Sequence, residues 1–364
     1  MRRWLLSVCV AATIAAGAGL ASASASSPLE FWPVSPNSGP SLSCNFLAGA
    51  QSNQIPGSIS VGPRCPTITF TRASGATSGL YTDAAGSSYT NYPTNVPRLM
   101  PQGFLRELQS SENYLLNSDT PTATQIITLG TGSFTLWVIG SGSAAVTLGT
   151  ALGTGTGTAT AGSPNIFTIT TGGTVVVTKT GTLTRYQLEP LALPTSYIPT
   201  TGSAATRAAE SATITAGGWL NPNAGTMVVT VMWPFISATV NMGTVSIDDT
   251  TNNNWITIFH ASGHSDVNGY VEVGGTIIMN SESGGSVSAG TAFTAGISFG
   301  RSTSPSVVLN GGTPISGSTA GMPGGLTRLI FGHVPGGGGL SGFIQSLVVY
   351  RQAMPSGQLQ RAAP

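Results

Sequence analysis

The stretch RYQLEPLALPTSYIPTTGSAATRAAE, residues 185–210, decides how the rest of the chain is organised. It opens as a strand-like run and then carries three prolines, Pro190, Pro194 and Pro199. A proline lacks the backbone N–H and pushes the preceding residue into an extended conformation, so this segment suits neither a helix nor a central strand. Apolar residues between the prolines indicate that it still packs. We expect an ordered connector, residues 189–206, between two all-β modules.

The composition of the 364-residue chain also indicates β-structure. Only 7% of the residues are charged, against about 25% in an average protein. The 49 Gly and 23 Pro, with many Ser and Thr, are poor helix formers, while the aromatic and β-branched content argues against simple disorder. We therefore expect an all-β fold of short strands and Gly-rich turns. The net charge of +1 gives no electrostatic basis for a nucleic-acid partner.

Residues 1–25 are signal-peptide-like. A basic start, Met1-Arg2-Arg3, precedes an apolar run over 4–20 and small-residue cleavage patterns such as Ala21-Ser22-Ala23. The alternative is an uncleaved anchor, but the run is short and rich in Gly and Ala. The pattern favours export and a secreted, extracellular protein.

The cysteines agree with export. Cys9 lies in the signal-like segment, whereas Cys44 and Cys65 lie in a Pro/Gly-rich, linker-like segment, residues 26–66. We predict a Cys44–Cys65 disulfide, as is common in an oxidising compartment. Two unrelated free thiols are the alternative.

Two further segments lie upstream of the connector: TITFTRASGATSGLYTDAAG at 67–86 and NVPRLMPQGFLRELQSSENYLLNS at 95–118. Together with QLEPLALPTSYIPT in the connector, they resemble segments common in bacteriophage and prophage tail or tail-fibre proteins. The chain departs from that pattern by a Ser-Gly pair inserted before Tyr81. The resemblance implies an N-terminal phage-type module over residues 67–119.

Residues 120–188 consist of strand-like runs split by Gly-rich turns. Six short runs in this span predict a small β-sandwich similar to a truncated carbohydrate-binding-module jelly roll. The low-complexity run at 149–164 predicts a long turn or an edge strand.

The final segment contains a strand at 326–332, a second strand at 342–351 and a short helix starting near Pro355. This order and its residues resemble the end of concanavalin A-like (laminin-G-like) lectin and glucanase jelly rolls. Gln358 stands where that family usually has an acidic residue. The resemblance implies that residues 207–364 form a larger concanavalin A-like jelly roll.

One loop in this module has the chemistry of a ligand site. Carboxylates and amides can bind Ca²⁺ or hydrogen-bond sugar hydroxyls, and a Trp can stack on a sugar ring. The alternative is an Asx-type turn followed by a core Trp. The candidate ligand-binding residues are Asp248, Asp249, Asn252, Asn254 and Trp255.

Other constellations do not predict catalysis or a metal. The adjacent Ser, His and Asp within 263–267 point to alternate faces of an extended chain and cannot form a triad. His260 and His264 lack the Glu of a zinc helix, and Gly263 disfavours that helix. Glu272 stands alone, without the paired carboxylates that a glycosidase needs. We expect no catalytic residue, no metal and no cofactor.

The sequence thus leads to a non-enzymatic tail-type structural or adhesion protein whose lectin-like domain binds a cell-surface glycan. The resemblance implies other tail or envelope proteins as partners and a location in the virion tail. It also implies a homo-oligomer, although the sequence has no heptad repeat that would form a coiled coil. An exported bacterial lectin-like protein is the alternative, and a glycan-degrading enzyme on the same fold is less favoured.

Overall fold

The computed structural model describes residues 39–47, 56–78, 90–334, 338 and 341–364. The chain divides into two compact units, Met1–Pro33 and Val34–Pro364. The first unit, with the signal-like segment 1–25, lies outside the described residues. Among the described residues, no helix is long and apolar enough to cross a membrane.

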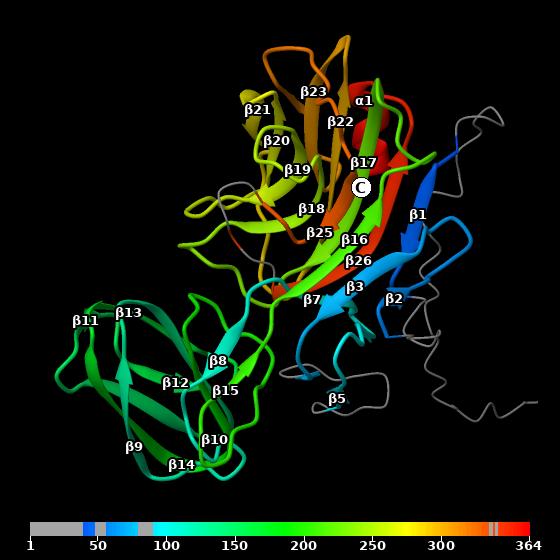
Figure 1. Ribbon diagram of the computed structural model, residues 1–364. Coiled ribbons are helices and arrows are strands. Elements are labelled where there is room, and N and C mark those ends of the chain that lie inside the picture. Colours follow the sequence, from blue (N-terminus) through cyan, green and yellow to red (C-terminus); the bar gives the residue numbers. More distant parts are fainter. Residues whose placement is uncertain (1–38, 48–55, 79–89, 335–337, 339–340) are drawn as a thin grey trace, which may run out of the picture. The chain divides into compact units, whose positions relative to one another are not determined.

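Two eight-stranded antiparallel sheets form the larger body (Figure 1). Sheet A has the order β24 (Ile315–Ser316), β23 (Thr303–Leu309), β22 (Ala292–Gly300), β17 (Ala224–Met232), β26 (Ser341–Tyr350), β7 (Gly103–Glu107) and β6 (Arg98–Met100), with β1 (Leu42–Asn45) also on β26. Sheet B has the order β2 (Ser58–Ile59), β3 (Ile68–Arg72), β16 (Glu210–Thr215), β25 (Arg328–Phe331), β18 (Met242–Asp248), β19 (Trp255–His260), β20 (Asn268–Val273) and β21 (Thr276–Glu282).

The inner faces of the two sheets share one apolar core. In β17, Met227, Val229 and Val231 enter this core, as the two-residue period of a strand requires. In β19, Ile256 and Ile258 do the same, so the residues between them face outward. Burial of alternate residues on both sheets is the arrangement of a β-sandwich, and it confirms the all-β class.

The N-terminal strands belong to this sandwich, which differs from the predicted domain boundaries. Leu42 of β1 pairs with Val349 of β26, although residues 26–66 were expected to be a linker. β3 pairs with β16, and β7 pairs with β26, although residues 67–119 were expected to be a separate module. The physical reason is that β16 and β26 need hydrogen-bonding partners along their open edges, and distant segments supply them.

A third sheet, the small sheet, has the order β11 (Leu152–Thr154), β13 (Asn165–Thr171), β10 (Gly132–Leu148), β14 (Gly173–Glu189) and β9 (Thr124–Leu129), with β12 (Thr158–Thr160) on β10. It has an apolar core of its own.

The small β-unit expected for residues 120–188 is present, and its strands are hydrogen-bonded into one six-stranded sheet. Runs expected as separate strands join into β10 and β14, each 17 residues long. The register shifts at Ile139/Gly140. Gly140 has φ 123°, and a Cβ there would lie 2.5 Å from the carbonyl oxygen of Thr182. Only glycine fits this bulge, which lets the strand continue while it bends.

Three smaller elements complete the described fold. β8 (Ser111–Asn113) pairs with β15 (Ala205–Arg207), and β4 (Ala76–Thr77) pairs with β5 (Asn91–Tyr92). The helix α1 (Ser356–Ala362) contacts β22 and β23 (Figure 1) and buries Leu359. A short helix after Pro355 is therefore confirmed.

A disulfide joins Cys44 to Cys65, with 4.7 Å between the Cα atoms. Cys44 is 1% exposed and lies in β1, and Cys65 is 7% exposed and precedes β3. Both sulfurs contribute to the large core. The bridge therefore links a strand of sheet A to the segment that enters sheet B.

We expect the double variant Cys44→Ser/Cys65→Ser to lose about 3 kcal/mol of unfolding free energy, because the bridge closes a loop of sequence separation 21. Urea unfolding of the variant and the parent, both carrying Cys9→Ser, measures the difference. Reduction of the parent should reproduce the loss. Equal unfolding midpoints in oxidising buffer would contradict a stabilising bridge.

Candidate functional site

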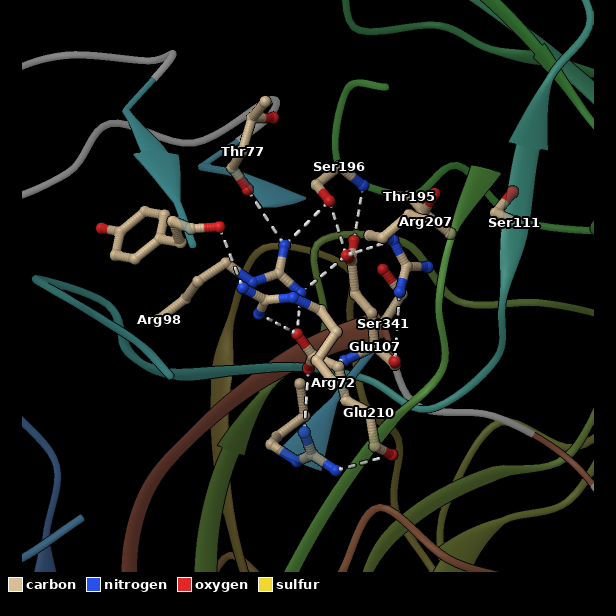
Figure 2. Close-up of polar contacts among 12 residues, drawn as sticks. Arg72, Thr77, Arg98, Glu107, Ser111, Thr195, Ser196, Arg207, Glu210 and Ser341 are labelled. Atoms are coloured by element: carbon tan, nitrogen blue, oxygen red, sulfur yellow. Dashed lines mark hydrogen bonds and ion pairs between the residues drawn. The ribbon is translucent and has the colours of Figure 1, made fainter. Parts of the chain in front are cut away.

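Six charged side chains meet at one end of the large core, and we call them the ionic cluster (Figure 2). They come from β3, β6, β7, β15 and β16, and all are 3% exposed or less. The members are Arg72, Arg98, Arg106, Glu107, Arg207 and Glu210.

Glu210, the first residue of β16, is the centre of the ionic cluster. Its Oε1 lies 3.0 Å from Nη1 of Arg72 and 2.6 Å from Nη2 of Arg98. Its Oε2 lies 2.8 Å from Nη1 of Arg106 and accepts the backbone N–H of Glu107 at 2.9 Å. The strands that bring these partners are far apart in sequence, so one carboxylate fixes β3, β6 and β7 relative to β16.

Glu107 extends the cluster towards the connector. Its Oε2 lies 2.8 Å from Nη2 of Arg98 and 3.1 Å from Nε of Arg207. The Ser196 hydroxyl donates to the same oxygen at 2.6 Å, and the Ser196 N–H donates to the other oxygen. The connector is thus tied to the sandwich by charge-assisted hydrogen bonds.

A third buried carboxylate, Glu189, ends β14 of the small sheet. It accepts hydrogen bonds from Trp137 Nε1 at 2.8 Å, Ser111 Oγ at 2.6 Å and the Thr195 N–H at 2.8 Å. Tyr197 is 2% exposed and packs edge-on against Trp137. The expectation that the connector packs is confirmed.

The carboxylates of the ionic cluster are held ionised. Burial alone would raise the pKa of Glu107, but Arg207 and Arg98 outweigh burial and lower the pKa to about 2. Burial lowers the pKa of Arg106 to about 10, with Glu210 opposing that shift. Burial raises the pKa of Glu189, and its hydrogen bonds only partly offset this.

The cluster holds four arginines and two glutamates, so cations exceed anions. Backbone carbonyls take up some of the remaining donors: Arg72 Nη2 donates to the carbonyls of Tyr92 and Pro93, and Arg207 Nη2 donates to that of Gln109. Such carbonyl dipoles compensate buried charge. The ionic cluster therefore has a structural role.

The outer face of sheet B carries a second group of polar and aromatic side chains. Register places Asp248 opposite both Arg328 and Trp255, and Trp255 opposite Glu272. The neighbours of these residues, such as Ile247 and Ile256, point into the core. The four side chains therefore form one row on the outer face.

Direct contacts fix the centre of this row. Asp248 accepts from Nε of Arg328 at 2.7 Å and from the Thr250 N–H at 2.9 Å. The His333 ring stacks on Trp255 with centroids 4.7 Å apart, and its Nδ1 lies 3.6 Å from Asp248. The side chains of Arg328 and His333 are 29% and 31% exposed, so they are the accessible part of the row.

The β18–β19 turn borders this row. Asp249 accepts the N–H and hydroxyl of Thr251 on one oxygen and Nδ2 of Asn254 on the other. Asn254 in turn accepts the N–H of Gly274. Thr250 has φ 74°, a left-handed conformation that is uncommon for a β-branched residue. The hydrogen bonds hold the turn in this shape.

The structure thus brings together four of the five predicted residues, Asp248, Asp249, Asn254 and Trp255, and leaves Asn252 exposed on the turn. The expectation that Trp255 stacks on a sugar is corrected, because its ring is 1% exposed beneath His333.

Sequence reasoning missed Arg328 and His333 in this role. Their proximity to Asp248 depends on the register of β25 with β18. The one signal in the sequence was that charged residues are rare in this chain, so that each of them is a candidate for a specific role.

Glu210→Gln should lower the unfolding free energy by about 3–5 kcal/mol, because it leaves three buried arginines short of their counter-charge. The control is Asp119→Asn, whose pair with Arg185 is 2.9 Å long but partly exposed and should be worth less than about 1 kcal/mol. Chemical denaturation measures both. Similar losses in the two variants would rule out a central role for Glu210.

The depressed pKa of Glu107 gives a second expectation. Its folded-state pKa of about 2 lies below the ordinary 4.5, so its stabilisation is present above the ordinary value and is lost as pH falls towards 2. Glu107→Gln should remove part of this acid dependence, on the order of 3 kcal/mol. Denaturation from about pH 6 to about pH 2 measures it, with exposed Glu282→Gln as control. Parallel curves for parent and Glu107→Gln would disprove it.

No protein-family model and no curated protein matches the chain. Among solved structures, it is similar to the Ruminococcus gnavus IT-sialidase CBM40 bound to α2,3-sialyllactose, with 12% identity over 40% of this chain and 84% of that one and a TM-score of 0.32. It is also similar to domain 4 of AbnA, a GH43 extracellular arabinanase from Geobacillus stearothermophilus in complex with arabinotriose, with 15% identity, 47% and 82% coverage and a TM-score of 0.36. These low scores carry no argument about function.

Proposed function

We propose that the protein is a non-enzymatic glycan-binding protein, and that its glycan binds the outer face of sheet B. The observation that carries the proposal is the pair of partly exposed side chains, Arg328 and His333, held over the buried Asp248 beside the polar β18–β19 turn. We call this group and the turn residues Asp249 and Asn254 the sheet-B face.

The sheet-B face offers the contacts that a sugar needs. The Arg328 guanidinium, the Asp249 carboxylate and the Asn254 amide can donate to or accept from sugar hydroxyls. The exposed side of the His333 ring, whose other side rests on Trp255, is a flat surface for the apolar face of a sugar ring. Asp249 and Asn254 are already held by hydrogen bonds, so little conformational entropy is lost on binding.

The electrostatics of Asp248 support a binding role over hydrolysis. Burial would raise its pKa, but the neighbouring His333 ring and the hydrogen bonds from Arg328 and the Thr250 N–H outweigh burial and hold the pKa below its ordinary value. A glycosidase general acid needs the opposite, a carboxyl group whose pKa is raised. Asp248 therefore suits a buried, ionised anchor that holds the Arg328 guanidinium in place for a ligand.

For the biological setting, we propose a phage or prophage tail-type structural or adhesion protein. Support comes from the three segments that resemble tail proteins, because they meet in the structure: Arg72 from 67–86 and Glu107 from 95–118 belong to the ionic cluster, and Ser196 of the connector donates to Glu107. The second candidate is an exported lectin-like protein, which the signal-like residues 1–25 favour.

Fractionation separates the two settings. A tail protein should copurify with virions and retain Trp4. An exported protein should be found in the medium of virion-free cultures, starting near Ser24 or Ser26.

Binding should depend on the sheet-B face. We expect a glycan array to identify a ligand. Titration calorimetry with that ligand should show that Asp249→Ala weakens binding about tenfold or more, since a hydrogen bond to a charged group contributes roughly 1.5–3 kcal/mol. His333→Ala should weaken binding about threefold to tenfold, because it removes the ring surface against which the sugar packs, a contact of roughly 0.5–1.5 kcal/mol. Asp119→Asn, in the turn before β9, should bind like the parent. An array without any bound glycan, or full affinity in both face variants, would refute the proposal.

A further inference from the structure

Three side chains gather beside the end of the β20–β21 ladder. His264 and Asp266 lie in the segment that leads from β19 into β20, and Glu282 is the last residue of β21. One ligand atom from each side chain lies within 4.8 Å of the others. Glu272 of the outer row lies at the far end of β20, so this group is separate from the sheet-B face.

The backbone holds these residues in position. Asp266 is 3% exposed; its carbonyl lies 2.7 Å from Nδ1 of His260, and its Oδ2 accepts the N–H of Gly284 at 2.8 Å. A turn closed by the His264 N–H and the Ala261 carbonyl presents the His264 ring. That ring places Nδ1 2.8 Å from Oε1 of Glu282. Asp266 is thus fixed, whereas the side chains of His264 and Glu282 are 39% and 57% exposed and can adjust.

A buried amide beside the group provides an independent observation. Asn268 pairs directly with Glu282 in the ladder, so their side chains leave the sheet on the same face. Asn268 is 5% exposed, and its Nδ2 donates to Asn280 at 3.2 Å. Its Oδ1 is buried and has no hydrogen-bond partner. A buried carbonyl oxygen without a donor is costly, and a bound cation would satisfy it.

We propose that His264, Asp266 and Glu282, with Oδ1 of Asn268, bind one divalent transition-metal ion of the Zn²⁺ class. An imidazole nitrogen together with carboxylate oxygens suits Zn²⁺, whereas Ca²⁺ is bound by oxygen ligands. The two carboxylates match the charge of the ion. Ligand atoms around one tetrahedral Zn²⁺ lie roughly 3.4 Å apart, so a small adjustment of the two exposed side chains closes the site.

The metal would join the segment before β20 to the end of β21. It would replace the exposed His264–Glu282 contact with bonds to an ion that also holds the buried Asp266. The expectation of no metal was based on His260 and His264 as partners, but in the structure His260 holds only the backbone of Asp266. The proposal is independent of glycan binding.

Titration calorimetry of the untagged full chain with ZnCl₂ tests the site. All proteins carry Cys9→Ser, because Cys9 is the thiol outside the Cys44–Cys65 bridge, and are first dialysed against a chelator. We expect one Zn²⁺ per chain and a higher melting temperature with metal. His264→Gln and Glu282→Gln alter exposed side chains, so they should fold normally and weaken binding at least tenfold. His333→Gln is the matched control and should bind like the parent.

Three outcomes would overturn the proposal. One is a ZnCl₂ titration that shows no saturable binding of one ion per chain. Another is unchanged affinity in both His264→Gln and Glu282→Gln. The third is binding of CaCl₂ with no binding of ZnCl₂, because the imidazole would then not be a ligand.

Discussion

The four contacts on the carboxylate of Glu210 are the constraint on which the rest of the structure depends. A charge at the end of an apolar core is tolerated only when its partners are all in place. Those partners are at the ends of strands from both sheets, and Glu107 carries the network to Ser196 of the connector. The cluster therefore couples the two sheets to each other and to the small sheet. A fold in which one of these strands is out of place would be destabilised, because it would leave a buried charge without its partner.

Local chemistry in the sequence predicted the fold class and many individual strands. Alternation along β17 and β19 and the glycine-rich turns indicate β-structure by themselves. The domain boundaries could not be read in this way, because pairing partners are not encoded locally. Ser41 donates to the carbonyl of Val349, 308 residues away. Likewise, the prolines of the connector correctly excluded a helix, but they gave no sign that Glu189 and Ser196 are fully buried.

The candidate site was predicted in part for the same reason. Asp248, Asp249 and Asn254 are turn formers in one short loop, so sequence proximity was enough to group them. Arg328 and His333 reach Asp248 only through the register of β25, which a single sequence does not specify. Trp255 was assigned to a ligand because a Trp beside polar residues suits both a sugar platform and a packed ring, and only its burial under His333 distinguishes the two.

The pairing of β1 and β7 with β26 also determines when the protein can fold during synthesis. The small sheet closes within a continuous stretch of chain and can form as soon as that stretch leaves the ribosome. The sandwich cannot, because its N-terminal strands pair with β26, which is synthesised after the small sheet. The early strands keep open edges until then, and the small sheet forms as an insertion inside a domain that is completed only after β26 has been made.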